Sequence, residues 1–332
     1  MRYTLSAITV LSLLLITYCD DNSSKVNRDD ELYTETEAPN LNPELYLKGF
    51  ISTGLSERDA AFSADGNEFY YTLWAGSFGV IVLTKKENDV WTKPEVVSFS
   101  HEYSNLEPFI TADGTRLFFA SNRPTNDSDE TEDYNIWFVE KTENNWSKPE
   151  APGLHINTDA NEFYPSLADN GNLYYTARYE NSIGGEDIWM CKFETGKYLE
   201  PINLGKNINS ETDEFNAFIS PDESFLIYSS WNREGGYGSG DLYISFKDQN
   251  NEWKSSINLG DRINSNSLDY CPFVSRDGKV FFFTSRKLSE ELDKKRIRDF
   301  DHITGLLNDP QNGQNDIYWM KASFIDSLRA VK

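Results

Sequence analysis

Short apolar stretches recur along this chain, and each of them runs into a polar turn. A stretch of about six residues with apolar or alternating positions leads into Asp-Gly or a close variant, which is a hairpin signal. The five copies of this phrase are Glu57–Gly66, Asn105–Gly114, Glu162–Gly171, Glu214–Glu223 and Asp269–Gly278. They follow one another at intervals of about 50 residues, a period typical of propeller blades.

Each phrase is followed by further apolar segments in the same order. The expected second strands are Phe69–Tyr71, Leu117–Phe119, Leu173–Tyr175, Leu226–Tyr228 and Phe281–Phe283. The expected third strands, after a loop of variable length, are Val80–Val82, Ile136–Phe138, Ile188–Met190, Leu242–Ile244 and Ile317–Trp319. The expected fourth strands lie near Trp91–Pro94, Trp146–Pro149, Tyr198–Pro201 and Trp253. A proline suits an outer strand, because an edge strand can spare one N–H group.

The fifth unit ends after its third strand, close to Met320. We expect Leu47–Gly54 to supply the missing fourth strand and to close the ring by pairing the two ends of the chain. The pattern therefore predicts an all-β fold, a β-propeller of five four-stranded blades within residues 46–325. Six blades are the alternative, but neither residues 20–45 nor residues 287–315 read as four further strands.

Several of the recurring motifs resemble those of TolB-type, WD40-like propeller repeats. The motifs are Ser220–Asp222, Ser121–Arg123, Thr284–Arg286, Gly184–Trp189 and Leu204–Asn209. The resemblance covers about residues 47–323 and implies a propeller that serves mainly in protein interaction, as in bacterial surface and periplasmic proteins. The chain departs from TolB itself, which has six blades. It shows no fused peptidoglycan-binding module, so the resemblance does not imply attachment to peptidoglycan.

The N-terminal residues have the features of an export signal. Arg2 precedes an apolar run, Leu5–Ile16, which is too short to span a bilayer comfortably and right for a signal peptide. The run leads to Cys19 and resembles a bacterial lipoprotein signal, although Tyr18 stands where a small residue is usual. We therefore expect residues 1–18 to be a lipoprotein signal peptide and Cys19 to be lipidated. The alternative is a plain cleaved signal peptide.

The segment that follows is polar and acidic. Residues 19–45 lack apolar periodicity and are expected to form a disordered tether. Asp20 and Asp21 resemble an acidic signal for surface export. Together these features predict a cell-envelope protein, anchored by lipid in the outer membrane and either surface-exposed or periplasmic. Membrane contact is then expected only through the lipid anchor.

Charge narrows the range of partners. The formal net charge is −23, which disfavours nucleic acid and anionic membrane surfaces as partners. The chain has only three His and three Cys, so a His/Cys metal site would need almost all of them. Cys191 and Cys271 fall in different strands of different units, and we expect both to be buried free thiols.

Two polar columns are expected on one face of the disc, opposite the Asp-Gly turns, which should form a plain face. The first column opens the innermost strands and consists of Glu57, Asn105, Glu162, Glu214 and Asp269. The second follows the second strands and consists of Arg123, Arg178, Arg233 and Arg286. Because they recur in nearly every unit, we expect arginine–carboxylate pairs that lock neighbouring blades together. The functional alternative is an acidic rim that attracts a basic partner or a cation.

Calcium would suit such oxygen ligands, but the chain has no Asp-x-Asp-x-Asp loop. We therefore assign no metal and no cofactor, and a calcium ion in the central channel remains the alternative.

Features that do not repeat are better candidates for a ligand site. The loops between second and third strands differ in length, with insertions at residues 124–133, 234–240 and 287–315 on the same face as the polar columns. Aromatic residues that could join them are Trp74, Tyr134, Tyr179, Trp231 and Tyr237. Loops on a rigid scaffold are where binding usually resides. The alternative for each ring is packing between blades.

No specific catalytic motif occurs in the sequence: there is no Gly-x-Ser-x-Gly, His-Glu-x-x-His, Cys-x-x-Cys or phosphate loop. The sequence therefore favours a non-catalytic propeller that binds a protein or peptide, and a basic ligand would suit the acidic rim. The alternative is a propeller that binds or hydrolyses carbohydrate with rim carboxylates such as Glu162 and Glu214, because glycosidases use paired carboxylates.

Overall fold

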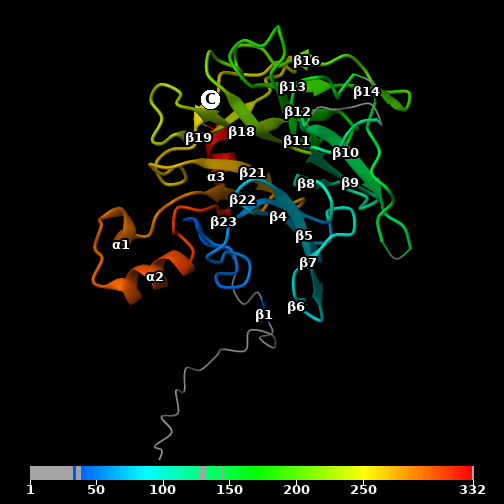
Figure 1. Cartoon of the computed structure of the whole chain (residues 1–332). Helices are drawn as coiled ribbons and strands as arrows, with labels where there is room; N and C mark the ends of the chain where they lie inside the picture. Colours follow the sequence, from blue (N-terminus) through cyan, green and yellow to red (C-terminus); the bar gives the residue numbers. More distant parts are fainter. Residues whose placement is uncertain (1–32, 35–38, 127–131, 144, 154, 331–332) are drawn as a thin grey trace, which may run out of the picture. The chain divides into compact units, whose positions relative to one another are not determined.

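Five antiparallel sheets form a ring in the computed structural model, which describes residues 33–34, 39–126, 132–143, 145–153 and 155–330 (Figure 1). The innermost strands are the five predicted first strands: β3 (Glu57–Phe62), β8 (Asn105–Ile110), β11 (Glu162–Leu167), β17 (Glu214–Ile219) and β21 (Asp269–Val274). Each inner strand contacts the next in this order, and β21 contacts β3, so the ring is closed. The predicted five-bladed propeller is confirmed.

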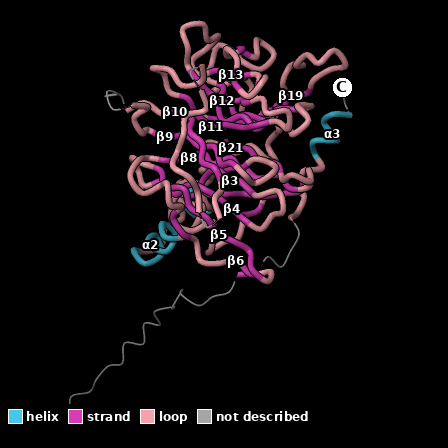
Figure 2. The backbone as a smooth tube through the Cα atoms, turned by 90° about the vertical axis from the view of Figure 1, so that its right-hand side faces the viewer, coloured by secondary structure: helices cyan, strands magenta, loops and turns pink. Residues whose placement is uncertain are grey.

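Each inner strand pairs with a second strand, and that strand pairs with a third. The second strands are β4 (Glu68–Trp74), β9 (Arg116–Ser121), β12 (Leu173–Ala177), β18 (Phe225–Trp231) and β22 (Val280–Ser285). The third strands are β5 (Gly79–Glu87), β10 (Asn135–Glu140), β13 (Asp187–Cys191), β19 (Gly240–Phe246) and β23 (Asp316–Lys321). Seen from the side in Figure 2, the strands make up the body and the helices lie at its margins.

The fourth strands are short, and those of blades one, three and four begin later than expected. They are β7 (Glu95–Val96), β16 (Ile202–Asn203), β20 (Ile257–Asn258) and, in blade five, β2 (Glu44–Leu45). In blade two a single bridge between Phe138 and Glu150 takes this place. The aromatic residues expected in fourth strands instead belong to hairpins that precede them, formed by β6 (Val90–Trp91) on β5 and by β14 (Phe193–Glu194) with β15 (Lys197–Tyr198).

The fourth strand of blade five comes from the N-terminal side of the chain. Glu44 lies opposite Trp319 and Leu45 lies opposite Tyr318 of β23. This pairing is earlier in the chain than the expected Leu47–Gly54. Leu47 has a φ of 43°, and its carbonyl accepts the Phe50 and Ile51 N–H groups, so this stretch turns instead of extending.

Every inner strand contains a bulge at its third residue, where the backbone is left-handed. The residues and their φ angles are Asp59 (66°), Glu107 (61°), Tyr164 (52°), Asn216 (50°) and Cys271 (52°). A bulge re-aims side chains and bends the strand. Left-handed backbone is unfavourable for Glu, Tyr and Cys, whereas Asp and Asn tolerate it, so five copies at one position mark a constrained central ring.

Hydrophobic packing between blades holds the disc together. Five clusters of buried apolar side chains each join two neighbouring blades. At the seam of blades one and five, Tyr46 packs edge-on against Phe69, Phe282 and Trp319. Cys191 and Cys271 are buried free thiols, as expected.

Among the described residues, helices occur only at the margins of the disc. α1 (Glu290–Asp293) and α2 (Phe300–Asn308) lie in the insertion between β22 and β23 and stand out from the sheets (Figure 1). α3 (Phe324–Ala330) places Phe324 edge-on against Phe281, with ring centroids 5.2 Å apart. In the described part of the chain, no helix has the length and apolarity needed to cross a membrane.

The expected signal peptide and Cys19 lie outside the described residues. Within the expected tether of residues 19–45, the structure describes two short strands. β1 (Tyr33–Thr34) pairs with β6, and β2 belongs to blade five.

Candidate functional site

The acidic column at the entrance to the inner strands is buried. Glu57, Glu162, Glu214 and Asp269 each accept hydrogen bonds from a Ser or Thr four residues earlier, namely Thr53, Thr158, Ser210 and Ser265. In the Glu214 pair, the Ser210 backbone N–H and Oγ both lie 2.6 Å from the carboxylate. These carboxylates therefore stabilise the connection into their own inner strand, and their side chains do not form an open rim.

Burial changes the acidity of this column. Burial raises the pKa of Glu57 and of Glu162 to about 7, although the hydrogen bonds from Thr53 and Thr158 oppose the rise. Burial also raises the pKa of Asp269. Each of these side chains is thus more easily protonated than a carboxyl group in water.

The arginine column does not form the expected locks. Arg123 donates to the Asn105 side chain at 2.6 Å and to the Phe99 carbonyl at 3.1 Å, and Arg233 donates to the Tyr228 hydroxyl at 3.1 Å. Arg286 donates to Asn315 at 3.1 Å. Among the described residues, no arginine of this column pairs with a carboxylate of the acidic column within 4.0 Å. The carboxylates bond Ser and Thr of their own connections, and the guanidinium groups of Arg123, Arg233 and Arg286 bind neutral oxygens.

The candidate aromatic residues divide into two groups. Tyr179 is structural, because its hydroxyl bonds Glu162 and Tyr175 at 3.1 Å each and its ring lies 4.9 Å from that of Trp189. Trp231 and Tyr237 are 38% and 50% exposed on the loops of blade four.

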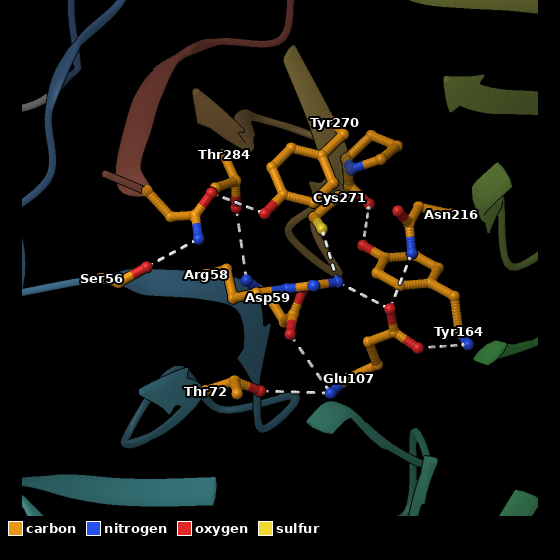
Figure 3. A network of polar contacts seen from close by, with 12 residues as sticks. Ser56, Arg58, Asp59, Thr72, Glu107, Tyr164, Asn216, Tyr270, Cys271 and Thr284 are labelled. Carbon is orange, nitrogen blue, oxygen red and sulfur yellow. Dashed lines mark hydrogen bonds and ion pairs between the residues drawn. The ribbon is translucent and has the colours of Figure 1, made fainter. Parts of the chain in front are cut away.

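A different polar group lies in the centre of the ring. The Arg58 guanidinium contacts Asp59 at 2.8 Å and Glu107 at 2.6 Å, and it lies 4.9 Å from the centroid of the Tyr270 ring (Figure 3). Burial would lower the pKa of Arg58, but the charge of Asp59 and its other neighbours raises it well above the usual value. Arg58 is therefore a fixed cation in blade one, which is the blade that lacks an arginine of the column.

Glu107 connects three other blades to its own. Its carboxylate accepts from Arg58, from the Tyr164 N–H at 2.7 Å and from Asn216 Nδ2 at 3.0 Å (Figure 3). Burial raises the pKa of Glu107, whereas the Arg58 charge lowers it. Three of these residues, including Glu107 itself, are left-handed bulge residues, so the bulges aim their polar groups at one another.

A pocket of about 280 Å³ opens beside this polar group, at the end of the central channel where the inner strands begin. We call it the channel-mouth pocket, and the face that carries the loops between second and third strands the loop face. The second residues of all five inner strands line the pocket: Arg58, Leu106, Phe163, Phe215 and Tyr270. Trp74, Tyr134, Glu107 and Glu186 complete its charged and aromatic lining.

Glu186 gives this pocket a second carboxyl group. Burial raises the pKa of Glu186 to about 7, and the nearby charge of Asp213 adds to the rise while that of Arg178 opposes it. No hydrogen bond to its carboxylate is present among the described residues, in contrast to Glu107. It is therefore the carboxylate of this pocket that is most available to a ligand.

Exposed apolar side chains collect on the loop face. In blades one, four and five, the loops between second and third strands carry Phe78, Trp231, Tyr237, Leu288, Ile297, Phe300 and Leu307. Phe300 at the start of α2 is 77% exposed. Large contiguous apolar areas on a soluble surface mark interaction sites.

The sequence pattern pointed to Trp74 and Tyr134 of the channel-mouth pocket but not to Glu107, Phe163, Phe215 and Glu186. The signal was present in part. The second residue of the phrase is Arg, Leu, Phe, Phe and Tyr in the five copies, and only the first copy has a charged residue there, Arg58. The inward aim of Glu107 depends on the bulge, which the residue pattern does not reveal.

The opposite face, which carries the Asp-Gly turns and which we call the turn face, is not plain as expected. It contains a larger cavity of about 670 Å³, lined by residues of all five blades. In the described part of the chain, no group of three or more His, Cys, Asp or Glu side chains is arranged to hold a metal ion.

Comparisons with known proteins agree with the fold. No protein-family model matches the chain, and no curated protein sequence matches it. The putative TolB from Agrobacterium tumefaciens is similar at 16% identity and a TM-score of 0.47, covering 70% of each chain. A glycoside hydrolase is similar at 8% identity and a TM-score of 0.54, covering 86% of this chain and 91% of that one.

A further solved structure, the BT0996 RGII complex, is similar at 9% identity and a TM-score of 0.57, with the same coverage of 86% and 91%. Likenesses at such low identity concern the fold alone. The chain is a five-bladed β-propeller of four-stranded blades, similar in fold to the glycoside hydrolase and to the BT0996 RGII complex.

Proposed function

We propose that the protein is a non-catalytic binding propeller that takes a basic group of a protein or peptide at the channel-mouth pocket. The observation that carries this proposal is the combination of an available carboxylate, Glu186, with the rings of Trp74, Tyr134, Phe163 and Phe215 in one pocket. Cations are attracted both by carboxylates and by the faces of aromatic rings.

The surrounding surface suits a protein partner. Trp231 lies against the pocket wall, with its ring centroid 6.4 Å from that of Phe215, and it connects the pocket to the exposed side chains of the loop face. Aromatic side chains near a pocket are the usual anchors of interfaces. The net charge of −23 would also favour encounter with a basic partner.

The test is selection of a random peptide library on the purified propeller, followed by affinity measurement of the enriched peptides. We expect enrichment of Lys and Arg, and at least tenfold weaker binding by Glu186→Gln and Phe215→Ala. Glu180→Gln is the matched control, because Glu180 is exposed on the same face and outside the pocket. Enrichment without basic residues, or affinity unchanged by Glu186→Gln, would contradict the proposal.

A second candidate is carbohydrate binding or hydrolysis. It is favoured by one observation: Glu186 lines the pocket without a hydrogen bond to its carboxylate among the described residues, and burial raises its pKa to about 7. Glycosidases need a carboxyl group that stays protonated near neutral pH. Glu162 and Glu214 are poorer candidates than the sequence suggested, because both are buried and bonded to Ser or Thr. Turnover of a polysaccharide panel that is lost in Glu186→Gln would favour this candidate.

We also propose that the protein acts in the cell envelope as a lipoprotein anchored through Cys19. This rests on the sequence of residues 1–19. Membrane fractionation of the full chain and of Cys19→Ser is the test. The proposal fails if Cys19→Ser stays in the membrane fraction.

A further inference from the structure

The cavity on the turn face lies at the other end of the channel from the channel-mouth pocket. Its volume of about 670 Å³ falls in the range of roughly 300–1,000 Å³ that is usual for small-molecule sites. This turn-face cavity extends from the channel toward the seam of blades two and three, because β9 and the β14–β15 hairpin contribute side chains to it. It shares no lining residue with the channel-mouth pocket.

Aromatic rings from four blades form the channel side of the cavity. Phe62, Phe109, Phe218 and Phe273 come from the ends of inner strands. The ring centroid of Phe273 lies 6.1 Å from that of Phe62 and 5.6 Å from that of Phe218. Phe62, Phe109 and Phe273 are only half-buried, so ring surface faces the cavity.

A second aromatic wall stands on the side of blade three. Phe193 and Tyr198 have ring centroids 5.0 Å apart, and both line the cavity. Phe193 lies directly on Gly171, where an added Cβ atom would come within 2.9 Å of its ring. The wall thus depends on a glycine that also has a φ of 86°. Such a wall is built by the fold and does not arise from chance exposure of one ring.

The rim of the cavity is charged, and its three cations, Arg116, Lys141 and Arg276, are already paired. Arg276 of blade five forms a two-pronged pair with Asp169 of blade three, at 2.6 and 2.7 Å, and thereby passes over blade four. Asp169 is also held by its N–H, which donates to the Pro221 carbonyl at 2.9 Å.

The other two cations of the lining are paired as well. Arg116 bonds Glu140 at 2.8 Å, and Lys141 bonds Glu68 at 3.0 Å. Asp113 accepts hydrogen bonds from Thr111 Oγ1 at 2.6 Å and from the Thr115 N–H at 3.0 Å. An anionic ligand would have to displace a carboxylate from one of these cations, whereas an uncharged ring would not.

We propose that the turn-face cavity binds an uncharged, planar aromatic small molecule between the channel phenylalanines and the Phe193–Tyr198 wall. Aromatic rings pair favourably in offset or edge-to-face geometry at centroid distances of roughly 4.5–7 Å, the spacing that these walls already show among themselves. Because the charged groups of the rim already bond other residues, ring contacts and the burial of apolar surface would hold the ligand.

The test uses 2-naphthol as the probe and ligand-observed NMR titration of the full propeller. We expect saturable binding that is at least tenfold tighter than that of trans-2-decalol, which has the same skeleton without aromatic rings. 2-Naphthoate should bind more weakly than 2-naphthol, because the three cations of the lining are already paired with carboxylates.

Ala112→Trp places a large side chain at the exposed rim and should weaken 2-naphthol binding at least tenfold. Ala75→Trp is the matched control, because Ala75 is equally exposed but lies on the loop face. Phe109→Leu keeps an apolar side chain and should abolish the preference for 2-naphthol over trans-2-decalol. Absence of saturable binding by wild type, or equal binding by wild type and a folded Ala112→Trp, would overturn the proposal. Neither outcome would affect the function proposed for the channel-mouth pocket, which shares no lining residue with this cavity.

Discussion

Asn216 of blade four donates a hydrogen bond to Glu107 of blade two, at 3.0 Å, across the centre of the ring. These blades are not neighbours, so this contact connects parts of the disc that none of the five hydrophobic seams joins. The same carboxylate also accepts the Tyr164 N–H from blade three. Glu107 is thus the point at which four blades meet.

Replacement of Glu107 by Ala should strongly destabilise the protein. It leaves Arg58 buried with one carboxylate in place of two, and removing one partner of a buried ion pair costs roughly 3–5 kcal/mol. Urea unfolding of both proteins measures the change. The triple variant Arg58→Met/Asp59→Asn/Glu107→Leu should recover much of the loss, because no buried charge then remains in this cluster. A loss below about 1 kcal/mol for Glu107→Ala would contradict this account of the centre.

Stability should fall as the pH rises from about 4.5 to about 7. The pKa of Glu57 and of Glu162 is raised to about 7, so the folded state keeps protons that the unfolded state has released. Their contribution to the free energy of unfolding is complete below pH 4.5 and is lost as the pH rises through about 7. The loss amounts to at most roughly 3 kcal/mol for each group. Asp316, with its pKa raised to about 8, extends the decline.

Urea unfolding across this pH range provides the measurement. Glu57→Gln should flatten the decline, because its side chain no longer titrates. Glu44→Gln serves as the comparison, since Glu44 is exposed. An equal decline in wild type and Glu57→Gln would show that Glu57 does not titrate in this range.

Binding of basic peptides should strengthen as the pH rises from 6 to 8. The pKa of Glu186 is raised to about 7, so its carboxyl group gains its negative charge in this interval. Isothermal titration with one enriched peptide at several pH values tests this. The trend should disappear in Glu186→Gln, and a trend that persists there must come from another group.

Two glycines should respond to alanine in opposite ways. At Gly238 an added Cβ would lie 2.0 Å from the Ser267 carbonyl oxygen, which forces the backbone to move. We expect Gly238→Ala to cost roughly 1–3 kcal/mol. At Gly305 nothing lies within 4 Å, and Gly305→Ala should stabilise α2 by about 1 kcal/mol. Thermal melting, with helix content from circular dichroism, distinguishes the two.

The closure of the ring should depend on Tyr46. Its fully buried ring packs against Phe69, Phe282 and Trp319, and its N–H donates to the Ile317 carbonyl at 2.8 Å. Tyr46→Ala should cost roughly 3–5 kcal/mol, as for other large buried aromatic residues. Leu41→Ala should change little, because Leu41 is 56% exposed. Equal effects of the two substitutions on urea unfolding would argue against a shared seam.

The fold was largely predictable because its local signals agree with its global arrangement. The Asp-Gly phrases are tight turns in the structure: Asp65 accepts from Ser63 Oγ at 2.6 Å and from the Asn67 N–H at 3.1 Å, and Gly66 has a φ of 72°. Such contacts span five residues at most, so the residue pattern contains them. The position of the closing strand was missed because the left-handed Leu47 gives no sequence signal.

The site was predictable only in part. The Ser/Thr-to-acid spacing of four, as in Ser210 and Glu214, is visible in the sequence and would have shown that the acidic column is engaged locally. By contrast, the five bulge residues are Asp, Glu, Tyr, Asn and Cys, with no shared chemistry. Their convergence follows from the ring geometry, which brings side chains from distant units together. The turn-face cavity was missed for the same reason.

The β2–β23 pairing has a consequence for the order of the blades along the chain. Asn40 and Lys321 lie side by side, because the Lys321 N–H donates to the Asn40 carbonyl at 2.8 Å. The two ends of the ring are therefore adjacent, and blade order around the disc does not depend on where the polypeptide starts. A circular permutant that joins the end of α3 to Asn40 by a linker and opens between blades two and three would keep every blade and every seam.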